Sequence, residues 1–111
     1  MSNASPSYFH LHLVSDSTGE TLTTIAKAAA VQYAQMRPIE HVHPLVRTRR
    51  QLDRALQELA STPGIVLYTL VQPELQIELE RRCRELKVPC LHVLEPVMKV
   101  FESYLGAPKT P

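Results

Sequence analysis

The residues best suited to chemistry lie in the segment 15–20, Ser-Asp-Ser-Thr-Gly-Glu, between an apolar run and a helical pattern. Its hydroxyls, its glycine and the free N–H groups of a helix start could bind a phosphate. The same letters also fit a capping box, in which Ser17 and Glu20 satisfy each other's backbone N–H groups. Capping accounts for those two residues and not for the rest of the segment. An anion site and a structural cap are therefore both open.

A second polar segment follows the next apolar run, where Arg47 precedes Thr48. Arg47 could reach an anion with its forked N–H donors, although most surface arginines are simply solvated. Thr48 and Gln51, three residues apart, predict another capping box. We expect Arg49 and Arg50 to lie in the exposed first turn of the helix that follows.

Four histidines alternate along two apolar runs, His10 and His12 in the first and His41 and His43 in the second. If those runs are neighbouring strands, the two pairs could meet at one metal ion. The better-supported interpretation is a sheet face packed on a helix, with ring nitrogens bonded to backbone or water. We therefore predict no metal site.

The glycine pattern bears on nucleotide binding. Glycine occurs only at 19, 64 and 106, and none of the three precedes a lysine. A P-loop needs two glycines five positions apart followed by Lys and Ser or Thr, and no GxGxxG is present either. We therefore expect these 111 residues to hold no nucleotide cofactor and no catalytic residue of their own.

The elements that must position these groups alternate regularly along the chain. Apolar, partly β-branched runs at 9–14, 42–46, 65–71 and 90–94 predict strands. Amphipathic patterns predict four helices. The first covers about 20–35 and is stopped by Pro38, and the other three begin after Thr48, at Pro73 and at Glu95. Between two of these elements, the Pro63–Gly64 turn predicts a positive φ at the glycine.

This alternation predicts an α/β fold with a four-stranded parallel sheet in the order 2-1-3-4 and helices on both faces, a Rossmann-like or flavodoxin-like three-layer arrangement. The chain reverses direction between strands 1 and 3. Ligands of such sheets bind in the crevice at that carboxyl edge, here between the segment 15–20 and Tyr68–Gln72.

Composition limits the class of protein. Twelve Lys+Arg against eleven Asp+Glu give a formal charge of +1, which predicts no nucleic-acid or membrane partner. Two cysteines and a polar N-terminal segment predict free thiols at Cys83 and Cys90 in a reducing cytoplasm. We expect a disordered tail over 1–8, one α/β domain over 9–106 and the start of a linker over 107–111.

Four stretches in order, 9–21 (FHLHLVSDSTGET), 43–48 (HPLVRT), 63–71 (PGIVLYTLV) and 83–91 (CRELKVPCL), resemble the bacterial phosphoenolpyruvate synthase / pyruvate, phosphate dikinase regulatory protein family. The resemblance implies a bifunctional serine/threonine kinase and phosphorylase. Such proteins use ADP to phosphorylate a threonine of the dikinase and inorganic phosphate to remove that phosphoryl group as pyrophosphate. Family members are more than twice this length and carry their P-loop in a C-terminal half, for which these residues have no counterpart.

The resemblance therefore implies the N-terminal domain of such a regulator, contributing target or phosphate recognition, with phosphoenolpyruvate synthase or pyruvate, phosphate dikinase as partner. The alternative is a non-catalytic interaction module that mediates docking or homodimer formation. A free-standing enzyme with Asp16 as base is disfavoured, because the loops offer no partner His, Lys or second carboxylate. The candidate phosphate- or target-binding residues are Ser15, Asp16, Ser17, Thr18, Gly19, Arg47, Tyr68 and Thr69.

Overall fold

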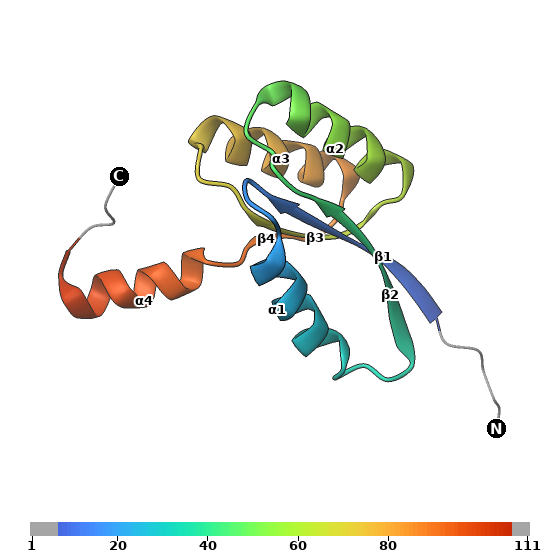
Figure 1. Ribbon diagram of the computed structural model, residues 1–111, viewed down its shortest axis with the longest axis horizontal. Coiled ribbons are helices and arrows are strands. Elements are labelled where there is room, and N and C mark those ends of the chain that lie inside the picture. The colour runs from blue at the N-terminus through green and yellow to red at the C-terminus, as the bar shows by residue number, and fades with distance from the viewer. Residues whose placement is uncertain (1–6, 108–111) are drawn as a thin grey trace.

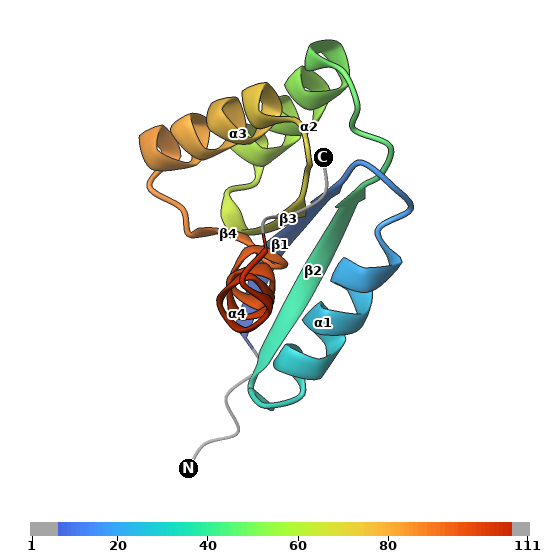
Figure 2. The same cartoon turned by 90° about the vertical axis from the view of Figure 1, so that its left-hand side faces the viewer.

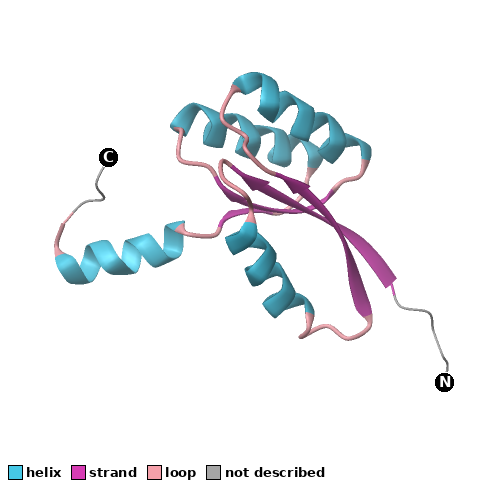
Figure 3. Ribbon diagram, viewed as in Figure 1, coloured by secondary structure: helices cyan, strands magenta, loops and turns pink. Residues whose placement is uncertain are grey.

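The computed structural model describes residues 7–107 and has the predicted α/β architecture (Figures 1 and 3). Eight elements alternate along the chain: β1 (Ser7–Ser15), α1 (Glu20–Ala30), β2 (Met36–His43), α2 (Arg49–Ser61), β3 (Gly64–Thr69), α3 (Pro73–Leu86), β4 (Cys90–His92) and α4 (Glu95–Leu105). The strands are all parallel and lie in the order β2-β1-β3-β4, which confirms the predicted topology. Of the predicted tail over 1–8, residues 1–6 lie outside the described residues, as does most of the predicted linker, 108–111, while residues 7 and 8 belong to β1.

The two faces of the sheet carry different helices. Helices α2 and α3 lie side by side on one face, while α1 lies on the other (Figures 1 and 2). The α2–α3 face contains the larger core, which includes the fully buried side chains of Leu52, Val66, Leu70 and Leu79. The α1 face has a smaller cluster, in which Leu22 and Ala26 pack on Leu11 and Leu13 of β1. Among the described helices, none is both long and apolar enough to span a membrane.

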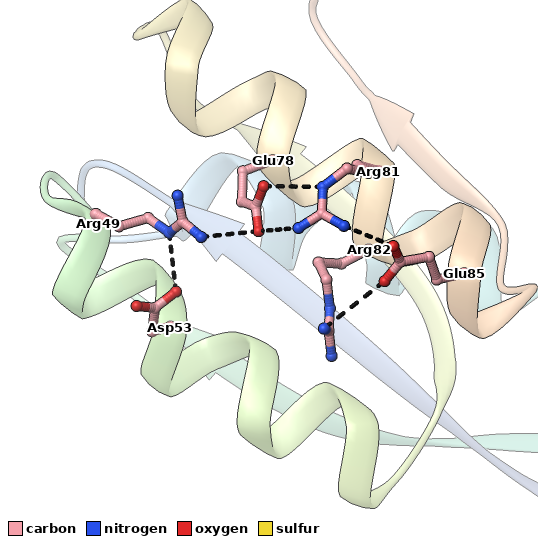
Figure 4. A network of polar contacts seen from close by, with 6 residues as sticks. All are labelled: Arg49, Asp53, Glu78, Arg81, Arg82 and Glu85. Carbon is pink, nitrogen blue, oxygen red and sulfur yellow. Dashed lines mark hydrogen bonds and ion pairs between the residues drawn. The ribbon is translucent and has the colours of Figure 1, made fainter.

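A chain of ion pairs joins α2 to α3 (Figure 4). These two helices cover the α2–α3 face of the sheet, which we call the covered face. Arg49 bonds Asp53 within α2 at 3.0 Å and reaches Glu78 of α3 at 2.9 Å. Glu78 also pairs with Arg81 at 2.6 Å, and Arg81 holds the pKa of the Glu78 carboxyl below its ordinary value. The pairs of Arg81 with Glu78 and Glu85 lie within α3, whereas the pair of Arg49 with Glu78 joins two helices.

The two largest departures from the predicted bounds lie near Pro38. Helix α1 ends at Ala30 rather than near Gln35, and β2 starts at Met36 rather than Val42, so Pro38 lies inside a strand. A proline lacks the N–H group that a central strand needs on both sides. β2 is an edge strand that pairs only with β1, and an edge strand tolerates a proline. β1 also starts earlier than expected, at Ser7 rather than Phe9.

Gly64 is required for a different reason from the one predicted. The glycines with positive φ are Gly19 and Gly106, so the expected left-handed turn at Gly64 is wrong. Instead, a Cβ atom at Gly64 would lie 2.0 Å from the carbonyl oxygen of His10 on β1. The close approach of the two strands, where His10 is in register with Gly64, leaves no room for a side chain.

Candidate functional site

The loop after β1 is attached to the neighbouring loops on both of its sides. Ser15 is buried, and its Oγ accepts hydrogen bonds from the backbone N–H of Ser17 at 2.9 Å and from the Thr69 hydroxyl at 3.3 Å. On the β2 side, the Ser17 carbonyl accepts from the N–H of Leu45 at 2.9 Å. The structure thus brings Ser15 and Thr69 together at the carboxyl edge, as the 2-1-3-4 order requires.

Asp16 connects three segments at this edge. Its carboxylate accepts a hydrogen bond from the N–H of Val71 at 3.0 Å, and its backbone carbonyl accepts one from Nε of Arg47 at 2.9 Å. A carboxylate that faces a backbone donor in this way holds the loop after β1 against the loop after β3. The geometry therefore favours a positioning role for Asp16 over direct contact with an anion.

The start of α1 differs from the predicted capping box. Gly19 occupies the N-cap position with φ 88°, and no side chain caps the helix there. Ser17 lies two residues before Gly19 and directs its own N–H to Ser15, so Ser17 and Glu20 do not form the expected reciprocal pair. A glycine suits this turn because the left-handed region disfavours every residue with a Cβ.

The second predicted cap is present in the structure. The Thr48 hydroxyl accepts from the N–H of Gln51 at 3.2 Å, and the Gln51 side chain accepts from the N–H of Thr48 at 3.0 Å. The Gln51 oxygen also accepts from the N–H of Arg47 at 2.7 Å, which fixes the backbone from which the Arg47 side chain extends.

A cleft of about 1280 Å³ opens beside the loop after β1. One wall is polar and consists of residues 15–21 with Thr69. The opposite wall is the inner side of α4, which contributes the apolar side chains of Met98, Phe101 and Leu105. His92, at the end of β4, also lines the cleft. Sequence reasoning found the polar wall but missed His92, which lies inside the predicted strand 90–94, and α4, which follows that strand.

Two of the predicted site residues do not line this cleft. Tyr68 points to the α2–α3 face, where it is 1% exposed and its hydroxyl donates to Glu80. Burial, reinforced by Glu80, raises the Tyr68 pKa. Tyr68 therefore does not form the predicted wall of the site. Alternate residues of β3 face opposite sides of the sheet, so Thr69 lines the cleft while Tyr68 faces the core. Arg47 lies exposed at the edge, and its Nε donates to the Asp16 carbonyl.

The charge of the cleft is predominantly acidic. Asp16, Glu20 and Glu102 contribute carboxyl groups to its lining, and among the described residues that line it there is no lysine or arginine. Anion binding in this cleft therefore depends on hydroxyl and N–H donors and on Arg47 beside it.

The four histidines form a hydrogen-bonded cluster away from the cleft, between the sheet and α2. Nδ1 of His10 lies 2.8 Å from Nε2 of His41, whose Nδ1 is 3.0 Å from the Glu58 carboxylate. In the second row, Nδ1 of His12 lies 3.0 Å from Nε2 of His43. The rings of His12 and His41 stack at 4.4 Å.

The backbone fixes the proton positions in that second row. Nε2 of His12 lies 2.7 Å from the Thr62 carbonyl, which can only accept, so this nitrogen carries the hydrogen. Nδ1 of neutral His12 then accepts from Nε2–H of His43. Burial is the main cause that lowers the pKa of both His12 and His43. Over residues 7–107, no group of three or more His, Cys, Asp or Glu side chains could hold a metal ion.

Cys83 of α3 and Cys90 of β4 are both free thiols, and Cys83 is fully buried. Their mutual hydrogen bond and burial raise the pKa of Cys90. The same hydrogen bond lowers the pKa of Cys83, whose side chain is enclosed in the core of the α2–α3 face. Because Cys90 stays protonated and Cys83 is out of reach of solvent, both act as small core side chains.

Comparison with known proteins decides the family. The kinase/pyrophosphorylase family model matches residues 11–111. The chain belongs to the kinase/pyrophosphorylase family. It is 59% identical over 104 residues to a protein of Rhodopseudomonas palustris (strain BisB5), and 58% identical over 106 residues to one of Bradyrhizobium diazoefficiens, both assigned the name pyruvate, phosphate dikinase regulatory protein.

These alignments cover 94% and 96% of this kinase/pyrophosphorylase chain, but only 37% and 38% of the two relatives. The chain thus spans less than two fifths of the length of the curated relatives it matches. The matched family region begins within β1 and includes the whole polar wall of the cleft.

Proposed function

We propose that this domain provides target and phosphate recognition for a cytoplasmic regulator of pyruvate, phosphate dikinase or phosphoenolpyruvate synthase. The regulator phosphorylates its target with ADP and removes the phosphoryl group with inorganic phosphate, while the nucleotide site lies outside these residues. Membership of the family and the names of the relatives support the regulatory role. The absence of a P-loop motif from these 111 residues supports the assignment of recognition, rather than nucleotide binding, to this domain.

The cleft at the carboxyl edge is the observation that carries the proposal. It combines a polar wall at a helix start with an apolar wall from α4, which suits a peptide segment bearing a phosphoryl group. The hydroxyls of Ser17 and Thr18, which are both exposed, and the first N–H groups of α1 would bind the phosphoryl oxygens. Ser15 and Asp16 would hold the loop in shape.

Arg47 would complete the anion site from the rim. Its Nε is bonded to the Asp16 carbonyl, which directs the guanidinium toward the loop after β1. A guanidinium that is already oriented loses less conformational freedom when it binds an anion. Because Glu20 and Glu102 line the same cleft, we expect inorganic phosphate alone to bind weakly and the apolar contacts of a target peptide to add affinity.

A phosphate titration followed by ¹H–¹⁵N NMR tests the proposal on this chain. We expect saturable shifts confined to residues 15–21, 47–48 and 69, and their loss in Arg47→Met. Arg50→Met is the matched control, because Arg50 is also an exposed arginine and makes no ion pair within residues 7–107. Equal weakening by both substitutions, or shifts spread over the surface, would show non-specific charge attraction and overturn the site.

An interaction module without a phosphate site is the second candidate. The exposed apolar side of α4 favours it, because a surface of this kind on a helix marks contact with another protein. A titration that moves no resonance in the cleft, together with self-association or docking through α4, would replace phosphate recognition by this function. Homodimer formation belongs to this candidate and is compatible with the first.

A further inference from the structure

Leu45 has a backbone conformation that disfavours its side chain. Its φ of 59° lies in the left-handed region, where a bulky residue is strained. Over residues 7–107, Lys87 is the only other non-glycine residue with positive φ, and it ends α3, where left-handed backbone is common. Leu45 ends no helix and follows Pro44, in a position that turns with positive φ normally fill with glycine or asparagine. A helix cap therefore explains the strain at Lys87 but not the strain at Leu45.

The Leu45 side chain adds little to the packing of the domain. It is 47% exposed and belongs to neither of the two core clusters that the described residues form. The next residue, Val46, is buried in the core of the covered face, so Val46 rather than Leu45 anchors this segment. Backbone strain is concentrated at binding and active sites. A strained residue that contributes little to the core is therefore a candidate for a binding role.

The strained turn places Leu45 beside the loop after β1. Three hydrogen bonds of 2.9 Å join the segment 45–47 to the segment 15–17, from the Leu45 N–H to the Ser17 carbonyl, from the Val46 N–H to the Ser15 carbonyl and from Arg47 Nε to the Asp16 carbonyl. Leu45 and Arg47 are both exposed, and neither lines the cleft. One short segment thus carries an apolar side chain and a guanidinium, and extends the candidate site beyond the cleft on the β2 side.

We propose that Leu45 is a specificity-determining contact for the target, which packs on an apolar side chain within two residues of the phosphorylated threonine. The inference rests on the proposed function, because it takes the phosphoryl group to bind at the hydroxyls of Ser17 and Thr18. Adjacent strands lie about 4.8 Å apart, and two residues of extended chain span about 7 Å, so a bound segment can reach from the loop after β1 to Leu45. The preferred substrate class is then a phosphothreonine segment with an aliphatic neighbour.

Such a contact supplies a discrimination that the phosphate contacts lack. Hydroxyl, N–H and guanidinium donors bind the phosphoryl group of any target equally, whereas Leu45 gains only from an aliphatic neighbour. Removing part of two aliphatic side chains from water corresponds to about a fivefold gain in affinity. We therefore expect Leu45 to select among phosphorylated segments and to leave the binding of inorganic phosphate unchanged.

A titration with two phosphopeptides, followed by ¹H–¹⁵N NMR on this chain, tests the inference. Both peptides have blocked ends and a central phosphothreonine, which is flanked on each side by two leucines in one peptide and by two serines in the other. We expect both peptides to shift residues 15–21. The leucine peptide should also shift the Leu45 amide and should bind the parent chain more tightly.

Leu45→Asn removes the apolar contact and keeps the backbone, because asparagine adopts the left-handed region more readily than leucine. We expect the affinity for the leucine peptide to fall about fivefold and the affinity for the serine peptide to stay the same. Leu45→Met keeps an apolar side chain and should retain the preference. Lys87→Asn is the matched control, because it introduces asparagine at φ 58° in a different part of the domain, and it should alter neither affinity.

Thermal unfolding checks that Leu45 serves binding rather than packing. Both asparagine substitutions should raise the Tm, since each relieves strain at a left-handed residue. A lower Tm for Leu45→Asn would show that the leucine side chain stabilises the fold, and would overturn the inference.

The binding results separate this inference from the proposed function. An unchanged preference in Leu45→Asn, or an equal loss of affinity for both peptides, overturns the role of Leu45 and leaves phosphate recognition in place. If neither peptide shifts residues 15–21, the phosphate site itself is wrong and the inference falls with it.

Discussion

On one face of the sheet, α2 and α3 bury a continuous aliphatic core and join each other through Arg49 and Glu78. On the other face, α1 buries Leu11 and Leu13 but leaves Ile65 and Leu91 substantially exposed, and α4 buries none of its own residues. Both faces are built from the same four strands. They differ in how completely the helices of one chain cover them.

The difference separates stability from recognition. The α2–α3 face holds most of the buried side chains, so it should dominate the free energy of unfolding. The α4 side supplies a wall of the cleft and an exposed apolar stripe, both of which can bind without unfolding the domain. Substitutions on the two sides should therefore have effects of very different size.

The largest expected loss comes from Gly64→Ala, at the point where β1 and β3 approach most closely. A Cβ atom there meets the His10 carbonyl oxygen at 2.0 Å, and neither backbone can move without breaking the sheet. We expect a loss of about 4 kcal/mol or more in urea unfolding, or no folded protein. Pro63→Ala, in the exposed part of the same turn, should change stability by less than about 1 kcal/mol. Equal stability of Gly64→Ala and the parent would contradict the strand packing.

The comparison of the faces is sharpest for two leucines. Leu79 of α3 is fully buried, so Leu79→Ala should lower the free energy of unfolding by about 2–5 kcal/mol. Leu91 of β4 is half exposed, so Leu91→Ala should cost less than about 1 kcal/mol. Similar losses at both positions would show that Leu91 is as well packed as Leu79, and would contradict the difference between the two faces.

The topology was accessible from the sequence because each element carries a local signal. Pro73 at the first position of α3 and the Thr48–Gln51 capping box mark helix starts that need no tertiary information. Pro38 was interpreted as the end of a helix, but a proline is also tolerated in an edge strand. Only the pairing of β2 with β1 decides between these two interpretations. The exposed position of α4 had no signal at all, since an apolar stripe looks the same whether it is packed or not.

The site was predictable in position and only partly in detail. The 2-1-3-4 order places the ends of β1 and β3 together, which identified Ser15 and Thr69. The near-continuous apolar run of β3 hides which residues face which side, so Tyr68 was assigned to the cleft while its side chain lies in the core. The bond from Asp16 to the N–H of Val71 joins loops 55 residues apart, and no local pattern predicts it.

The histidine cluster under α2 should make the covered face sensitive to pH. His12 and His43 have folded-state pKa values below the ordinary 6.5, mainly because they are buried. Their neutral forms contribute stability that is complete above pH 6.5 and is lost as the pH falls through the lower folded-state pKa. We expect the free energy of unfolding to decrease over that window in a urea series.

His43→Gln identifies the source of this decrease. Glutamine can still donate to His12 but cannot take up a proton, so the decrease should become shallower. His92→Gln, outside the cluster, should leave it as in the parent. A His43→Gln variant with the parental pH dependence would assign the effect to groups elsewhere.

The smallest expected effects compare the C-terminal caps of α3 and α4, which both adopt left-handed backbone. Lys87 ends α3 at φ 58°, where a residue with a Cβ is strained, so Lys87→Gly should stabilise the domain by about 1 kcal/mol. Gly106 ends α4 at φ 64° with open space around its Cα, so Gly106→Ala introduces the same strain without a clash. Because α4 buries nothing in the monomer, that strain should loosen the last turn of α4 and change the free energy of global unfolding by less than about 0.5 kcal/mol.

Hydrogen exchange distinguishes the two cases. Lys87→Gly should slow exchange throughout the core of the covered face, and Gly106→Ala should speed it only near the end of α4. A global loss of about 1 kcal/mol from Gly106→Ala would mean that α4 is docked in the cooperative unit, and the contrast between the two faces would then be incorrect.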